Sequence, residues 1–115
     1  MPRYMFVVFT NAVEGRDGEF NDWYTNRHIP DVLTIDGFVA AQRFKLTATV
    51  PKQESAHRYL ALYELDTDDL AKTQQALADA SEAGMFQVTE ALDLSTSVAT
   101  YFTQITDRIT SEKAR

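Results

Sequence analysis

The sequence contains no cysteine and only two histidines among its 115 residues. Without cysteine there are no disulfides, thiolate nucleophiles, iron–sulfur clusters or cysteine-bound zinc ions. His28 and His57 lie far apart in the chain and no set of carboxylates clusters with them, so we expect no metal site. A glycine-rich phosphate loop and a Gly-x-Ser-x-Gly elbow are also missing, and we expect no bound cofactor.

Long apolar runs and basic clusters are missing as well. No apolar stretch approaches the roughly 20 residues that a membrane-spanning helix needs. Lys and Arg number 11 against 17 Asp and Glu, and the net charge of −6 disfavours a polyanionic partner. We interpret the apolar start, "MPRYMFVVFT", as a strand rather than a signal peptide, because no small-residue cleavage site follows it. We therefore expect a cytoplasmic protein that binds neither nucleic acid nor membranes.

The residues that are present are typical of one globular domain. Hydrophobic residues make up 44% of the chain and charged residues 24%, close to the average for folded proteins. A chain of this length suits a single domain with its own core. We expect one domain over residues 1–115, in which the charged end "DRITSEKAR" (107–115) forms a flexible tail.

The order of apolar patterns predicts four strands and two helices. Strands are expected where Val, Phe, Tyr and Leu concentrate, at residues 3–10, 38–46, 57–65 and 95–106. The first helix is expected at 19–33, interrupted near Pro30, and the second at 66–84, ending at Gly84. The resulting β-α-β-β-α-β order indicates a ferredoxin-like α+β fold with a four-stranded antiparallel sheet.

Two helices cover only one face of a four-stranded sheet. Residues 3–10 and 57–65 are nevertheless apolar at both odd and even positions, so both faces of these strands are apolar. An apolar sheet face of this size favours aggregation when it is left in water. The sequence therefore predicts a homodimer in which a second copy packs sheet to sheet.

The segment "NDWYTNRHIPDVL" (21–33) concentrates aromatic and titratable side chains. His28 follows Tyr24 by four residues, which places both on one face of a helix. Aromatic surroundings disfavour a charged imidazole, so His28 is a candidate neutral base for removing a proton next to a carbonyl or from a phenol. The alternative is a structural histidine that bonds a backbone carbonyl near the helix break.

Asp31 and Tyr24 are the candidate catalytic partners of His28. Asp31, three residues further on, either orients the imidazole ring or favours the start of the turn that Pro30 opens. Tyr24 either donates a hydrogen bond to a substrate oxygen or packs in the core.

The first helix resembles that of the dimeric α/β-barrel superfamily, in particular its EthD-like branch. The resemblance rests on an aromatic pair, a helix histidine, a proline and a Gly-Phe strand start, here Trp23, Tyr24, His28, Pro30, Gly37 and Phe38. It implies a homodimer whose two sheets form a barrel, with a ligand cavity near the first helix of each subunit. The superfamily includes cofactor-free polyketide cyclases, quinone-forming monooxygenases, muconolactone isomerases and haem-degrading enzymes. The asparagine, tryptophan and histidine constellation of the haem-degrading members has no match here.

Several further side chains are candidates for binding a substrate. Arg43 and Lys45 point to one side of the second strand, where they either hold a carboxylate or phenolate or protect the edge of the sheet. The aromatic residues of the sheet form mostly core, and some of them could line a pocket for a flat ligand. The predicted substrate-binding residues are Trp23, Arg27, Arg43, Phe6 and Tyr59.

These observations predict a cofactor-independent enzyme that acts by acid–base chemistry on a small hydrophobic aromatic or polyketide-like carbonyl compound. The expected catalytic residues are His28, Tyr24 and Asp31. Isomerisation, cyclisation and dehydration need the same proton transfer, so the sequence does not choose among them, and cofactor-free oxygenation is a further option. The alternative is a homodimer that binds a small ligand, or acts in a stress response, without turnover.

Overall fold

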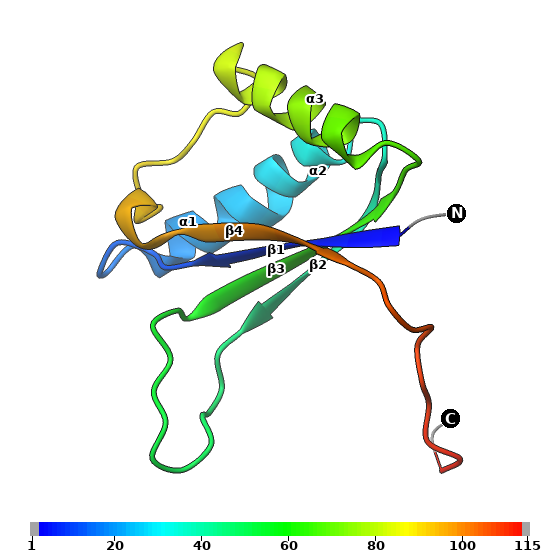
Figure 1. The fold of residues 1–115 in the computed structure, drawn as a ribbon. Coiled ribbons are helices and arrows are strands. Elements are labelled where there is room, and N and C mark those ends of the chain that lie inside the picture. The colour runs from blue at the N-terminus through cyan, green and yellow to red at the C-terminus, as the bar shows by residue number, and fades with distance from the viewer. Residues whose placement is uncertain (1–2, 114–115) are drawn as a thin grey trace.

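The computed structural model describes residues 3–113, which form a sheet with helices packed on one of its faces (Figure 1). The elements are β1 (Arg3–Thr10), α1 (Asp17–Trp23), the π-helical turn η1 (Tyr24–His28), α2 (Ile29–Val32), β2 (Phe38–Lys45), β3 (Tyr59–Asp66), α3 (Leu70–Glu82), the 3-10 turn η2 (Leu94–Thr96) and β4 (Val98–Thr103). The predicted β-α-β-β-α-β order and ferredoxin-like α+β fold are confirmed. Among the described residues, no helix combines the length and apolar character that crossing a membrane requires.

All neighbouring strands run antiparallel, in the order β2-β3-β1-β4. The first strand of the chain therefore lies inside the sheet, between the third and the last. Its Phe6 is opposite Tyr63 on one neighbour and opposite Tyr101 on the other. This register brings three aromatic side chains together on the face beneath the helices.

The core lies between the sheet and the helices. Side chains of a strand alternate between its two faces, and on β3 the helix-facing residues are at most 5% exposed: Tyr59, Ala61, Tyr63 and Leu65. Phe20 of α1 is fully buried, and its ring centroid lies 5.1 Å from that of Tyr59. These contacts hold the first helix against the sheet.

The first helix is continuous and contains a π-helical turn. The interruption expected near Pro30 begins before the proline, in η1, where the Ile29 N–H donates to the Tyr24 carbonyl five residues back. Pro30 has no N–H for the carbonyl four residues before it, so the regular α-helical ladder loses a hydrogen bond at this place. Pro30 then lies in the first turn of α2, a position that tolerates proline. Hydrogen bonds between residues five apart widen the helix at η1.

The second helix starts later than the sequence predicts. α3 begins at Leu70 rather than at residue 66, because the Asp69 carboxylate caps it by accepting the backbone N–H of Lys72. Thr73 lies on the packed face of this helix and is buried. Gly37 approaches Thr73 so closely that a Cβ at position 37 would lie 2.9 Å from Thr73 Cγ2. The turn before β2 therefore packs directly against α3, with no room for a side chain at position 37.

The last strand is shorter than the predicted range of 95–106. The hydroxyls of Ser95 and Ser97 bond back to Asp93, and Leu94–Thr96 form the turn η2. Local side-chain bonds of this kind compete with pairing in a sheet. The predicted tail at 107–115 has no helix or strand up to residue 113; residues 114–115 lie outside the described part of the chain.

The sheet face away from the helices is uncovered in the single chain (Figure 1). It carries four large apolar side chains that are between 37% and 56% exposed, which we call the open face: Phe9, Phe44, Val98 and Phe102. The loop between β2 and β3 and the segment after β4 project on this same side of the sheet (Figure 1). The apolar character expected for both faces of the sheet is therefore present.

Candidate functional site

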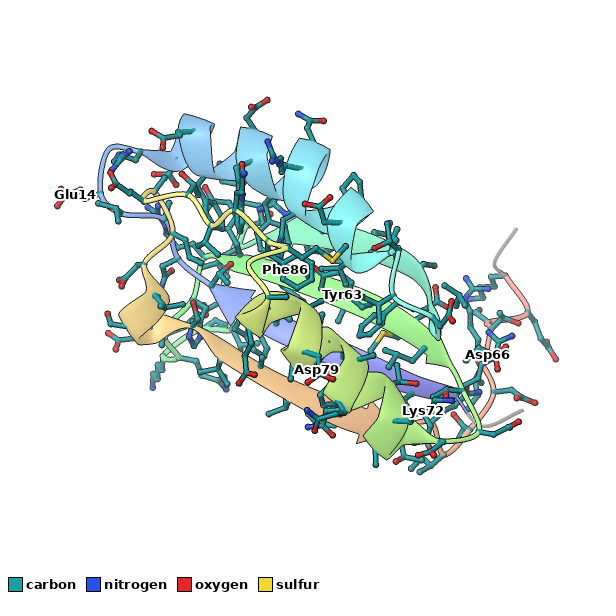
Figure 2. All side chains as sticks on the ribbon, turned by 90° about the horizontal axis from the view of Figure 1, so that it is seen from above. Glu14, Tyr63, Asp66, Lys72, Asp79 and Phe86 are labelled. Carbon is teal, nitrogen blue, oxygen red and sulfur yellow. The ribbon has the colours of Figure 1, made fainter. Side chains whose placement is uncertain are left out.

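A cavity of about 500 Å³ lies between the sheet and the helices. Side chains of β1, β3 and β4 form its floor, and side chains of η1, α3 and the segment after α3 form its walls. We call it the His28 cavity, after the one histidine in its lining. Seen from above, Tyr63 and Phe86 of this lining lie between the two helices (Figure 2). The volume is in the range of small-molecule binding sites.

His28 is enclosed by aromatic rings. Its imidazole stacks on the Trp23 indole, with ring centroids 4.6 Å apart and planes inclined by 20°. Tyr24 and Phe86 meet the imidazole edge to face, at centroid distances of 5.0 and 5.3 Å. On a regular α-helix, residues three or four apart share a face. The π-helical turn instead brings residues five apart together, and this turn accounts for the stack of Trp23 on His28.

The aromatic surroundings keep His28 neutral. Burial lowers the pKa of His28 to about 4, and the negative charge of Asp31 opposes this shift only in part. The imidazole is therefore uncharged at physiological pH. Its Nδ1 atom is buried and has no hydrogen-bond partner among residues 3–113. The alternative of a structural histidine expects a bond from the ring to a backbone carbonyl near the helix break. At Nδ1 the structure shows no such bond within these residues.

Asp31 acts on His28 through its charge and lies outside the cavity lining. It is in the first turn of α2, where a carboxylate is favourable. Its backbone carbonyl accepts a hydrogen bond of 2.7 Å from the Thr34 hydroxyl. Because Nδ1 of His28 has no partner, Asp31 does not hold the ring at that atom.

Two buried tyrosines meet beside His28. The Tyr63 hydroxyl donates to the Tyr24 hydroxyl over 3.1 Å, which joins β3 to η1 across the two layers. Both residues line the cavity and are at most 2% exposed. Burial raises the pKa of each phenol. Both hydroxyls therefore stay protonated and keep their capacity to donate a hydrogen bond.

Arg43 lies on the far side of Tyr24 and is not part of the cavity lining. Its guanidinium donates to Asn21 Oδ1 over 2.8 Å and to Thr25 Oγ1 over 2.9 Å. It also lies 4.5 Å from the centroid of the Tyr24 ring, in a cation–π contact. Burial lowers the pKa of Arg43, but an arginine remains charged at neutral pH. Arg43 thus connects β2 to the first helix.

The other predicted substrate-binding residues divide into two pairs. Phe6 and Trp23 line the His28 cavity, whereas Tyr59 and Arg27 do not. Tyr59 is part of the core, and its hydroxyl donates to the Asp17 carboxylate over 2.5 Å. Arg27 is exposed and donates to the Gln87 side-chain oxygen over 2.6 Å.

The sequence reasoning missed the segment 85–88, which closes one side of the cavity. Phe86 and Val88 of this segment line the cavity. The Trp23 indole N–H holds it in place by donating to the Gln87 carbonyl over 2.6 Å. The available signal was the apolar pair Met-Phe directly after Gly84, the residue that ends the helix.

The wall of the cavity is uncharged. Among the described residues that line it there is no Asp, Glu, Lys or Arg. Its polar groups are an imidazole, an indole N–H, an amide and several hydroxyls: His28, Trp23, Gln74, Thr10, Tyr24, Tyr63, Ser81, Ser97 and Tyr101. Across residues 3–113 we find no group of three His, Asp or Glu side chains placed to hold a metal ion. The cavity can enclose a flat apolar compound, with a neutral base and hydroxyl donors beside it.

The fold places this protein among the EthD-like α+β structures. An antiparallel four-stranded sheet covered on one face by helices is the fold of EthD-like proteins. An EthD-like protein from Ralstonia eutropha matches with a TM-score of 0.68 at 14% identity, covering 94% of this chain and 96% of that one. The resemblance that the first helix indicated is confirmed.

Two further solved structures show the same fold. An EthD family protein from Bacillus halodurans matches with a TM-score of 0.56 at 14% identity, over 88% of this chain and 96% of the other. HapK from Hahella chejuensis matches with a TM-score of 0.57 at 12% identity, over 100% of this chain and 99% of the other. Identities this low extend the likeness to the fold and no further.

The chain belongs to the family described as Domain of unknown function (DUF4286), whose model matches residues 3–113. A comparison with curated proteins gave no match. The family description assigns no activity, so the function has to be inferred from the geometry of the cavity.

Proposed function

We propose that this protein is an enzyme that moves a proton on a small hydrophobic carbonyl or phenolic compound, without a bound cofactor. The observation that carries the proposal is the neutral imidazole of His28 in the wall of an apolar cavity of about 500 Å³. A neutral imidazole is the form that accepts a proton. Most buried polar side-chain atoms have a hydrogen-bond partner. Nδ1 of His28 has none among the described residues, so no hydrogen bond at this atom assigns the ring a structural role.

The proposed reaction begins when His28 takes a proton from a carbon next to the substrate carbonyl. The C–H electron pair then forms an enolate, and His28 becomes an imidazolium whose charge Asp31 favours. The Tyr24 hydroxyl donates to the substrate oxygen that gains negative charge. Where a double bond extends the enolate, return of the proton to the far carbon of that bond gives an isomer. Where the β-carbon carries a hydroxyl, transfer of the proton to that departing hydroxyl gives an unsaturated product and water. A phenol substrate would lose its O–H proton to His28 in the same way.

We also propose that the protein is a homodimer that pairs through the open face. Four large apolar side chains on one sheet face support this proposal, since Phe9, Phe44, Val98 and Phe102 are all more than a third exposed. The fold shared with EthD-like proteins agrees with it. The His28 cavity lies on the other side of the sheet, between the sheet and the helices.

Proton exchange with solvent tests the proposed chemistry. 2-Indanone is a small, flat, uncharged ketone with acidic hydrogens next to its carbonyl. In D₂O at pH 7 the protein is expected to exchange these hydrogens faster than buffer alone, as followed by proton NMR. His28→Gln is expected to reduce the exchange to the buffer rate.

His57→Gln is the matched control. The His57 ring lies outside the cavity and bonds the Thr96 carbonyl over 2.7 Å, so this variant should exchange like the wild type. Equal exchange by wild type and His28→Gln would contradict the role of His28. Binding of 2-indanone without any exchange would instead support the alternative of a ligand-binding protein without turnover.

A further inference from the structure

We propose that the paired hydroxyls of Tyr24 and Tyr63 form one oxygen-binding group in the His28 cavity, and that the cavity selects uncharged ketones over carboxylates. This inference rests on the proposed function of the cavity. It adds the substrate class and assigns Tyr63 as a positioning residue. The sequence pattern gave a catalytic role to Tyr24 and counted Tyr63 only among the sheet aromatics that are mostly core, because the two tyrosines lie 39 positions apart.

The hydrogen bond between the two tyrosines uses only one of their two hydroxyl protons. The two hydroxyl oxygens lie 3.1 Å apart and share one proton, so the pair keeps a second proton that it can donate to a ligand. In the described part of the chain, Tyr63 is the one hydrogen-bond partner of the Tyr24 hydroxyl. This bond fixes both oxygens and directs the remaining proton away from the bond between them. A hydroxyl that already accepts a bond is also a stronger donor.

The cavity offers no charge to compensate a carboxylate. No Asp, Glu, Lys or Arg is found among its described lining residues, and burial keeps His28 neutral. A carboxylate entering this space would lose its hydration without gaining a cationic partner, and that loss is costly. A ketone oxygen needs one or two hydrogen bonds, which the tyrosine pair can supply.

Arg43 explains how an uncharged wall can still stabilise negative charge during a reaction. Its guanidinium lies behind the Tyr24 ring, 4.5 Å from the ring centroid, and is hydrogen-bonded to Asn21 and Thr25. A ligand in the cavity therefore meets the tyrosine hydroxyl, while the positive charge acts through the ring. Such a fixed charge favours the negative charge that develops on an enolate oxygen.

Three ligands that share the indane ring system test the inference: indane, 2-indanone and indane-2-carboxylate. Trp23 is the one tryptophan of the chain and lines the cavity, so its indole N–H gives a single NMR signal that reports occupancy. Titration at pH 7 is expected to show that the wild type binds 2-indanone at least about tenfold more tightly than the carboxylate. Equal or tighter binding of the carboxylate would overturn the proposed selection.

The variants Tyr63→Phe and Tyr24→Phe test the pair. Each should weaken binding of 2-indanone by roughly fivefold, the effect of losing one hydrogen bond. Binding of indane, which has no oxygen, should not change. The double variant should lose little more than either single one, because the two hydroxyls act as one group. Tyr4→Phe, which removes a hydroxyl outside this cavity, serves as the control.

A purely structural role for Tyr63 predicts a different result. Tyr63→Phe would then weaken indane and 2-indanone equally or leave both unchanged, and either result would overturn the assignment. If Tyr63→Phe does not fold, Tyr24→Phe and the wild-type ligand series still decide the question. His28→Gln separates the two proposals, because it should abolish proton exchange while the preference for the ketone remains.

Discussion

The His28 imidazole lies nearly parallel to the Trp23 indole, at a centroid distance of 4.6 Å. The same indole donates its N–H to the Gln87 carbonyl over 2.6 Å, so the ring that supports His28 is itself held by the segment that closes the cavity. A cation on the face of an indole is favourable. Burial nevertheless dominates, because the pKa of His28 falls to about 4.

Acid should destabilise the protein through His28. The pKa of this ring is about 4 when folded and about 6.5 when unfolded. Between these values the unfolded chain binds a proton that the folded chain does not, so stability is complete above pH 6.5 and falls as the pH falls toward 4. We expect the free energy of unfolding to be about 2 kcal/mol lower at pH 5 than at pH 7. Urea denaturation at both values measures this difference.

The His28→Gln variant identifies the origin of that pH dependence. Glutamine does not titrate, so most of the difference between pH 5 and pH 7 should disappear in the variant. A difference of unchanged size would show that other groups cause it, and that His28 is not held neutral by the fold.

Gly37→Ala should destabilise the fold for two reasons. Gly37 has a φ of +99°, which disfavours other residues, and a Cβ there would lie 2.9 Å from Thr73 Cγ2. Gly15→Ala is the matched control, since Gly15 has a φ of +81° but no atom within 4 Å of the position that its Cβ would take. We expect Gly37→Ala to lose about 2–3 kcal/mol and Gly15→Ala about 1 kcal/mol. Equal losses in urea denaturation would mean that the contact with Thr73 contributes nothing.

Arg43→Lys should destabilise the protein by about 1–2 kcal/mol although the charge is kept. The guanidinium of Arg43 donates to Asn21 and Thr25 through two different nitrogens while it contacts the Tyr24 ring. A lysine has a single ammonium nitrogen and cannot make all three contacts. Arg108→Lys, an exposed position in the C-terminal segment, should change the free energy of unfolding by less than about 0.5 kcal/mol. Equal stability of both variants would contradict the importance of these contacts.

Phe102→Lys should convert the proposed dimer into a monomer. The Phe102 side chain is 56% exposed on the open face, so a charge there would be buried between two sheets in the dimer but solvated in the monomer. Light scattering after size exclusion should give a dimer mass for the wild type and a monomer mass for the variant. Val13→Lys, at an exposed valine between β1 and α1, should remain a dimer. A monomeric wild type at micromolar concentration would refute the dimer.

Local patterns in the sequence were sufficient to predict the order of the elements. The concentration of Tyr and Leu along β3 and the apolar residues three and four apart on α3 (Leu70, Ala76, Leu77 and Ala80) follow from local backbone geometry, so they can be read without knowing what packs against them. The ends of elements were predicted less well. The start of α3 and the bounds of β4 depend on which of several neighbouring hydroxyls and carboxylates bonds the backbone, here Asp69 and Asp93.

The sequence by itself determined the composition of the site near His28, because Trp23, Tyr24 and His28 are neighbours on one short helix. Only the tertiary structure decided the rest of the cavity. Tyr63 and Phe86 reach His28 from β3 and from the segment after α3, and Arg43 is placed behind Tyr24 rather than in the cavity. The physical reason is that strand register and layer packing set contacts between distant residues, and these depend on the whole chain.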